Sequence, residues 1–167
     1  KSGVTEQTTD VFLESAYFNP MWVRKTARRH GLNTDSSFRF ERGADPNNTL
    51  YVLKRAAMLV KELAGGEIVG DIVDIYPQPI GNYPVTLGYD HINALVGKVI
   101  PEDTVKSILA SLEMEIVEEK DGVLSLMVPT YRVDVRRDVD VIEDILRIYG
   151  YNNVEFTDTV HSNLSYK

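Results

Sequence analysis

The sequence predicts an α+β fold made of two domains. Segments that begin with a capping residue and a proline and end at a glycine are typical of helices, and they alternate with short runs rich in β-branched and aromatic residues. Three prolines and a glycine fall within residues 77–84, which indicates a linker near the middle of the chain. We therefore expect one domain over 1–80, a second over 81–157, and a frayed polar tail over 158–167.

The first half predicts two strands, two helices and a loop. The runs 9–18 and 67–76 are rich in β-formers and read as strands. Asn19-Pro20 and Asp45-Pro46 each place a capping side chain directly before a proline, and Gly31 and Gly65-Gly66 follow the last apolar positions. These signals predict helices over 20–30 and 46–64. The segment 34–46 is dense in Ser, Asp, Arg and Gly, so we expect a loop or a short irregular strand.

The second half predicts a small module of helices around a hairpin. A Gly-containing turn at Lys120-Asp121-Gly122 separates two short β-rich runs, which is typical of a β-hairpin. The apolar residues from Asp140 onward suit a buried helix that ends at Gly150. The expected elements are a strand over 83–88, a helix over 90–96 capped by Asp90, a helix over 101–112, a hairpin over 115–119 and 123–128, and the final helix. This order is compatible with a winged helix-turn-helix-like arrangement.

Composition narrows the class of protein. The chain has 167 residues, of which 43% are hydrophobic and 26% charged, as expected for one or two globular domains. Its net charge of −7 argues against general binding to nucleic acid, so any RNA contact needs a local basic patch. Cysteine is absent, and no apolar stretch reaches the length of a membrane span. The opening residues read as mid-domain sequence, which predicts a segment of a longer protein.

Four carboxylates lie in or just before the final helix: Asp134, Asp140, Glu143 and Asp144. The last three, together with Arg147, follow the i, i+3, i+4, i+7 spacing that places side chains on one helix face. Like charges on one face repel, so something must offset them. One explanation is the helix N-terminus together with pairing to nearby arginines. The other is a hard cation such as Mg²⁺, which takes oxygen ligands and is usually held by one or two carboxylates.

The exposed positions of the first predicted helix are basic: Arg24, Lys25, Arg28, Arg29 and His30. They suit a solvated face whose cations lie near the negative end of the helix dipole. They also suit a contact with phosphate groups of tRNA or of a partner. The sequence alone leaves both explanations open.

The residues around the acidic helix carry a long motif, RVDVRRDVDVIEDILRIYGYNNV. It resembles the signature of a small module in the β subunit of bacterial phenylalanine–tRNA ligase, an Arg-x-Asp followed by an acidic helix and Arg-x-Tyr-Gly-Tyr. In that family four acids of this motif bind Mg²⁺ at the contact with the α subunit. The resemblance places these ligands on Asp134, Asp140, Glu143 and Asp144. The family usually has Glu at the last position, so a direct bond from the shorter Asp144 is the least secure of the four.

The first half extends the resemblance through LESAYFNP and GLNTDSSFRFERGADP. These segments look like the C-terminal part of the same subunit's editing domain, which hydrolyses tyrosine wrongly attached to the phenylalanine tRNA. The family's pocket residues fall on Glu14, Thr34 and Ser36, the last of which is usually Ala. A carboxylate such as Glu14 can accept a hydrogen bond from the phenol that distinguishes Tyr from Phe. Without the resemblance, Glu14 reads as an exposed strand residue and Thr34 as a turn residue.

The resemblance covers Val4 to about Phe156 and implies a fragment of a cytoplasmic ligase β subunit. Such a ligase attaches phenylalanine to its tRNA with ATP and Mg²⁺, and works as an α₂β₂ heterotetramer. The family's aminoacylation residues lie on the α subunit, so we expect the fragment alone to be inactive. The alternative is a non-catalytic winged-helix module that contacts nucleic acid or a protein partner. The acids of the final helix oppose a nucleic-acid contact there, because they would repel phosphate.

Overall fold

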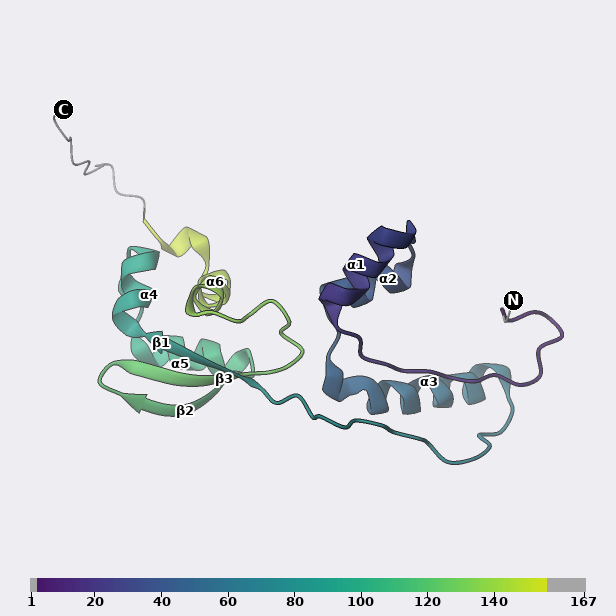
Figure 1. The fold of residues 1–167 in the computed structure, drawn as a ribbon. Coiled ribbons are helices and arrows are strands. Elements are labelled where there is room, and N and C mark those ends of the chain that lie inside the picture. Colours follow the sequence, from purple (N-terminus) through teal and green to yellow (C-terminus); the bar gives the residue numbers. More distant parts are fainter. Residues whose placement is uncertain (1–2, 156–167) are drawn as a thin grey trace. The chain divides into compact units, whose positions relative to one another are not determined.

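The computed structural model describes residues 3–155, so the tail predicted over 158–167 lies outside the described residues. Helices and a three-stranded antiparallel sheet are both present, which confirms the α+β class. The chain divides into two compact units (Figure 1). Unit 1 contains Lys1–Gly81 and Thr130–Val133, and unit 2 contains Asn82–Pro129 and Asp134–Lys167. None of the helices within 3–155 has the length and apolar content that crossing a membrane requires.

Unit 1 is built from helices whose ends carry clear local signals. Asn19 caps the first helix by accepting hydrogen bonds from the backbone N–H groups of Met21 and Trp22, at 3.1 and 3.3 Å. Gly31, with φ +63°, ends the same helix. The next two helices follow without a strand between them. The elements are α1 (Pro20–His30), α2 (Asp35–Arg42), the short 3₁₀ helix η1 (Pro46–Asn48) and α3 (Thr49–Ala64).

Three predictions for the first half are wrong. The runs 9–18 and 67–76 form no strand, because strand residues need a partner for their backbone groups and no described segment pairs with them. The segment 34–46, expected to be a loop or a short irregular strand, contains the helix α2. Thr34 accepts a hydrogen bond from the Ser37 N–H at 3.1 Å, and the Ser37 hydroxyl accepts one from the Thr34 N–H at 3.0 Å. This reciprocal capping box starts the helix.

Unit 1 leaves most of its apolar side chains exposed. None of the residues of α1, α2 or α3 is buried. Phe12 and Val69 in the extended segments are 93% and 92% exposed, and Leu63 near the end of α3 is 81% exposed. Phe18, which precedes α1, meets Phe40 of α2 edge to face with ring centres 5.0 Å apart, and this contact joins the start of α1 to α2. This unit therefore presents an extensive apolar surface.

Unit 2 is a small sheet covered by three helices (Figure 1). The strand order is β1-β3-β2, and both pairings are antiparallel, as the predicted hairpin requires. Alternate residues of β1 and β3 are buried, so one face of the sheet carries the core. The elements are β1 (Tyr83–Gly88), α4 (Tyr89–Val96), α5 (Glu102–Ser111), β2 (Glu115–Lys120), β3 (Val123–Val128), α6 (Asp138–Tyr149) and η2 (Tyr151–Asn153).

The core of unit 2 is continuous from the sheet to α6. Leu87 and Leu124 lie opposite each other on β1 and β3 and are fully buried. Val141 and Ile145 of α6 are also fully buried in this cluster. The final helix begins at Asp138, two residues before the predicted start, and ends before Gly150 as expected. The prediction that Asp90 caps α4 is wrong, because Gly88 is the N-cap and no side chain caps this helix.

Candidate functional site

Asp140 lies in the first turn of α6 and is surrounded by hydrogen-bond donors. Its Oδ2 accepts hydrogen bonds from the backbone N–H groups of Arg136 and Arg137, at 3.1 and 2.9 Å. Its Oδ1 accepts one from the Arg137 guanidinium at 2.8 Å. The Arg137 hydrogen bond, followed by the backbone N–H of Arg136, lowers the pKa of Asp140 to about 2. Asp140 is therefore an ionised helix-capping residue.

Glu143 and Asp144 share a cation one turn further along α6. The Arg147 guanidinium lies 2.5 Å from Glu143 Oε1 and 3.6 Å from Asp144 Oδ1. The Glu143 side chain is 56% exposed, whereas that of Asp144 is 13% exposed. The charge of Glu143 is the largest cause of a raised pKa of Arg147. Glu143 and Asp144 therefore lie close enough on α6 to contact one arginine, as their spacing predicts.

The fourth acid, Asp134, is exposed in the segment before α6. Asp138, which the sequence did not single out, pairs with Nδ1 of His91 on α4 at 2.9 Å. Within residues 3–155, no three His, Cys, Asp or Glu side chains are gathered closely enough to hold a metal ion together. The carboxylates predicted as Mg²⁺ ligands therefore form no closed ligand set among the described residues.

The three residues predicted for an editing pocket lie on separate parts of unit 1. Glu14 is exposed in the extended segment before α1. Thr34 caps α2, and Ser36 is exposed in the first turn of that helix. Thr34 lines a hollow of about 430 Å³ between α1 and α2, whose other walls are mainly apolar. Neither Glu14 nor Ser36 lines that hollow, so the described residues do not bring the three together in one cavity.

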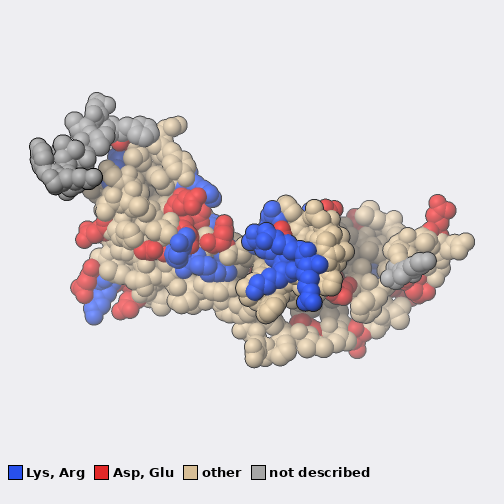
Figure 2. Space-filling model, turned by 45° about the horizontal axis from the view of Figure 1, so that its top comes forward, with Lys and Arg blue, Asp and Glu red and all other residues tan. Residues whose placement is uncertain are grey.

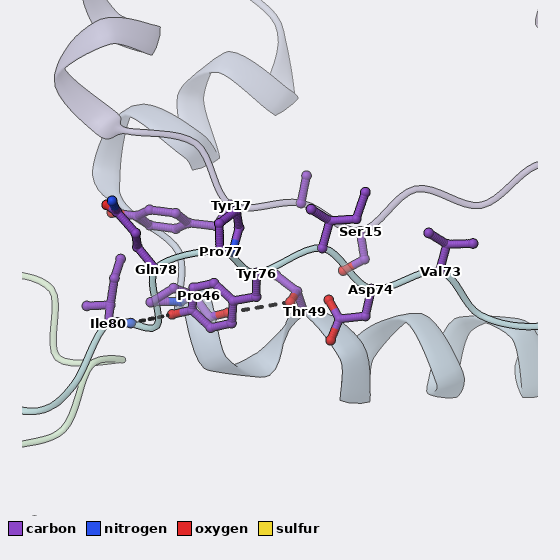
Figure 3. Close-up of a pocket in the computed structure, with 12 residues that line it drawn as sticks. Ser15, Tyr17, Pro46, Thr49, Val73, Asp74, Tyr76, Pro77, Gln78 and Ile80 are labelled. Carbon is purple, nitrogen blue, oxygen red and sulfur yellow. Dashed lines mark hydrogen bonds between the residues drawn. The ribbon is translucent and has the colours of Figure 1, made fainter.

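A second hollow, of about 610 Å³, lies beside the start of α3 (Figure 3). One side is formed by Ser15 to Tyr17, the residues that follow Glu14, and another by the segment that ends at Ile80. The Tyr76 hydroxyl accepts a hydrogen bond from the Ile80 N–H at 2.8 Å, which closes the turn at this end (Figure 3).

A polar network that the sequence did not reveal lies beside this hollow. Asn47 donates hydrogen bonds to the Ile80 carbonyl and to the Thr130 hydroxyl, at 3.0 and 3.1 Å, and accepts one from the Tyr76 hydroxyl. The buried Thr130 hydroxyl donates to Asp45 Oδ1 at 2.6 Å. Asp45 and Asn47 were visible in the sequence only as part of a helix start. Their partners are distant in the chain, so no local signal indicated the network.

Another cluster joins α4, α5 and β2 in unit 2. The Tyr89 hydroxyl donates a hydrogen bond to Glu119 Oε1 at 3.1 Å, and Lys106 Nζ lies 2.7 Å from Glu119 Oε2. Burial, and then the interaction with Glu119, raises the pKa of Tyr89 to about 12. The Lys106 hydrogen bond lowers the pKa of Glu119. This cluster keeps a buried phenol neutral and is a structural tie between the elements.

Both halves of the chain match known domain families. Residues 1–65 match the B3/4 domain, and residues 85–151 match the tRNA synthetase B5 domain. These matches cover the helices of unit 1 and almost all elements of unit 2.

Curated relatives are similar over nearly the whole chain. The chain is 65% identical over 166 residues to the phenylalanine–tRNA ligase β subunit of Bacteroides fragilis, which is 99% of this chain and 20% of that protein. It is 55% identical to the phenylalanine–tRNA ligase β subunit of Porphyromonas gingivalis over 99% of this chain and 20% of that protein. It is 42% identical to the β subunit of Geobacter sulfurreducens over 93% of this chain and 20% of that protein. The chain spans about a fifth of the length of these relatives.

Proposed function

Because the chain belongs to the phenylalanine–tRNA ligase β-subunit family, we propose that it performs the role of this segment in such a ligase. The whole enzyme would attach phenylalanine to its tRNA with ATP in the cytoplasm, as an α₂β₂ assembly. The observation that carries the proposal is 65% identity to a ligase β subunit over 99% of the chain. In this proposal the exposed apolar residues of unit 1, such as Phe12 and Val69, pack against other parts of a β subunit.

Unit 2 is proposed to be a winged-helix-like module that docks onto the α subunit. Its apolar residues pack into a core of its own, so its polar surface can contact a partner protein. The acidic face of α6 suits a basic protein surface better than a nucleic acid, because Glu143 and its neighbours would repel phosphate. The alternative of a nucleic-acid-reading α6 is therefore disfavoured, whereas protein docking fits the charge.

Mg²⁺ is proposed to be shared between α6 and the α subunit. When bound, the ion would neutralise part of the negative charge of the carboxylates on this chain that hold it. The proposed ligands on this chain are Asp134, Asp140, Glu143 and Asp144. Arginines and backbone N–H groups engage Asp140, and Arg147 engages Glu143 and Asp144, so an ion at this face would share or replace these contacts. Since Mg²⁺ usually takes one or two protein carboxylates and fills its shell with water or partner oxygens, we expect binding only with the α subunit.

Calorimetry with the α subunit of the Bacteroides fragilis ligase tests the docking and the metal together. We expect the chain to bind the α subunit more tightly with Mg²⁺ than with a chelator, and Glu143→Gln to remove that difference. Glu118→Gln, which changes an exposed acid on β2 by the same charge, is the matched control and should keep it. Docking that is equally strong with the chelator and in both variants would exclude a metal at α6. The absence of docking would exclude unit 2 as the docking module.

Unit 1 is proposed to contribute Glu14, Thr34 and Ser36 to the hydrolysis of mischarged tyrosyl-tRNA. A chimeric β subunit, in which this chain replaces the matching 166-residue segment of the Bacteroides fragilis protein, supplies the rest of the domain. In the chimera, Glu14→Ala should slow release of tyrosine from tRNA by about a hundredfold, because the site loses its acceptor for the phenol. Charging with phenylalanine should not change. Unimpaired tyrosine release in Glu14→Ala would exclude the proposed role.

A further inference from the structure

The segment 130–133 belongs to unit 1, although the residues on both sides of it belong to unit 2. Pro129 comes directly before the segment and Asp134 directly after it, and both are part of unit 2. We call residues 130–133 the strap. None of the strap residues lies in a helix or a strand. Side-chain contacts with the rest of unit 1 therefore decide where the strap lies.

Unit 1 contacts both ends of the strap. At the first end, the buried Thr130 hydroxyl donates a hydrogen bond to Asp45 Oδ1 at 2.6 Å and accepts one from Asn47 Nδ2 at 3.1 Å. At the other end, Gly43 lies against Val133, since an added Cβ on the glycine would be 3.0 Å from Val133 Cγ1. Breaking the bond between Thr130 and Asp45 would leave a buried polar group unsatisfied, so this contact resists opening.

The same asparagine also contacts the linker that leads from unit 1 to β1. Asn47 donates a hydrogen bond to the Ile80 carbonyl at 3.0 Å, and the Ile80 N–H donates one to the Tyr76 hydroxyl at 2.8 Å (Figure 3). The strand β1 begins shortly afterwards at Tyr83. The residues 45–47 of unit 1 therefore fix both the linker before β1 and the strap before α6.

The strap leads directly into the start of α6. Val133 is the last strap residue, and Val135 is 3% exposed in the core of unit 2, so only Asp134 separates two anchored valines. The backbone N–H groups that follow donate to Asp140 in the first turn of α6. Acidic and basic side chains lie next to one another on the face of unit 2 that Figure 2 shows, so their interactions depend on where each side chain is placed.

We infer that Asp45 and Asn47 act through the strap to position Asp134 and the first turn of α6. While Thr130 is bound to unit 1, the chain before α6 is anchored at both ends. When Thr130 is released, only one anchor remains, and Asp134 gains conformational freedom that any ligand of α6 would have to remove. By reciprocity, a ligand that orders the start of α6 strengthens the contact of the strap with unit 1.

Hydrogen exchange of the full 167-residue chain, followed for each residue by NMR, tests this positioning without any α subunit. The reporters are the backbone N–H groups of Arg136 and Arg137, which donate to Asp140. Asp45→Ala should speed their exchange by about tenfold, because the strap loses a buried hydrogen bond to a carboxylate and opens more often. Thr130→Val removes only the hydroxyl from the same bond and should have the same effect.

The double variant Asp45→Ala/Thr130→Val should exchange as fast as either single variant, because both substitutions break one bond. Effects that multiply in the double variant would overturn the inference, since the two residues would then act independently. Circular dichroism of each variant checks that the helices remain.

The matched control is Asn19→Ala. Asn19 and Asp45 both cap a helix and both precede a proline, but Asn19 caps α1 through the N–H groups of Met21 and Trp22. The control should loosen α1 and change the exchange of the reporters before α6 by less than about twofold. Equal acceleration in Asn19→Ala and Asp45→Ala, or unchanged exchange in both Asp45→Ala and Thr130→Val, would overturn the inference.

Discussion

Replacing Asp140 by Asn should destabilise unit 2 in a pH-dependent manner. The carboxylate accepts hydrogen bonds from two backbone N–H groups and from Arg137, and its pKa falls from 3.8 to about 2. A shift of this size corresponds to at most about 2.4 kcal/mol of folding free energy. Because the side chain lies near the surface and solvent screens it, we expect about 1 kcal/mol, similar to the loss of a helix cap.

The sign of the pH dependence follows from the lowered pKa of the folded state. The stabilisation by Asp140 is complete above the unfolded pKa of about 4 and is lost as the pH falls toward 2. Urea unfolding, followed by circular dichroism in the presence of a chelator, should give a difference of about 1 kcal/mol between wild type and Asp140→Asn at pH 7. The difference should vanish near pH 2. Asp103→Asn, an exposed acid in the first turn of α5, is the control. A difference that stays constant from pH 7 to pH 2 would refute the assigned cause.

Three further perturbations test the packing and the electrostatics. Ile145→Ala should cost unit 2 about 2–5 kcal/mol in urea unfolding because Ile145 is fully buried, whereas Ile145→Val should cost about 1 kcal/mol. Gly43→Ala should shift the NMR resonances of the Val133 methyl groups, because φ is +94° and an added Cβ would lie 3.0 Å from Val133 Cγ1; Gly31→Ala, which has open space, should not. Ultraviolet titration should show one phenol that ionises near pH 12, and this transition should be absent in Tyr89→Phe. The folding free energy that the raised pKa of Tyr89 contributes should be lost as the pH rises from about 10 through 12. A phenol that still ionises near pH 12 in the variant would contradict the assignment to Tyr89.

The second half could be predicted well because its signals are local. The Gly-containing turn formed the β2–β3 hairpin, and Gly150 ended α6, as expected. The apolar period also predicted that this helix is buried, and Val141 and Ile145 of α6 are fully buried. Local signals did not indicate which hydrogen-bond donor each acid of α6 contacts. Arg137 folds back onto Asp140 through the geometry of the helix start, and spacing alone could not distinguish this pairing from metal binding.

The elements of the first half were predicted less well, because they depend on contacts between residues far apart in the chain. The residues 9–18 and 67–76 have strand-like composition, but a strand forms only when another strand supplies hydrogen-bond partners. In contrast, α2 could have been found, because Thr34 and Ser37 stand at the spacing of a capping box. The density of Ser, Asp and Gly around them favoured a loop. The network from Asn47 to Thr130 joins residues 83 positions apart, and no pattern within a short window can reveal it.

Aminoacylation by the chimeric β subunit tests the proposed function most directly. The chimera is purified with the Bacteroides fragilis α subunit, and the rate at which it attaches phenylalanine to its tRNA is measured against the parent enzyme. If this chain performs the role of the matching β-subunit segment, the complex should assemble and charge tRNA within about tenfold of the parent rate. A folded chimera that does not assemble with the α subunit, or that assembles but charges tRNA more than about a thousandfold more slowly, would contradict the proposed function.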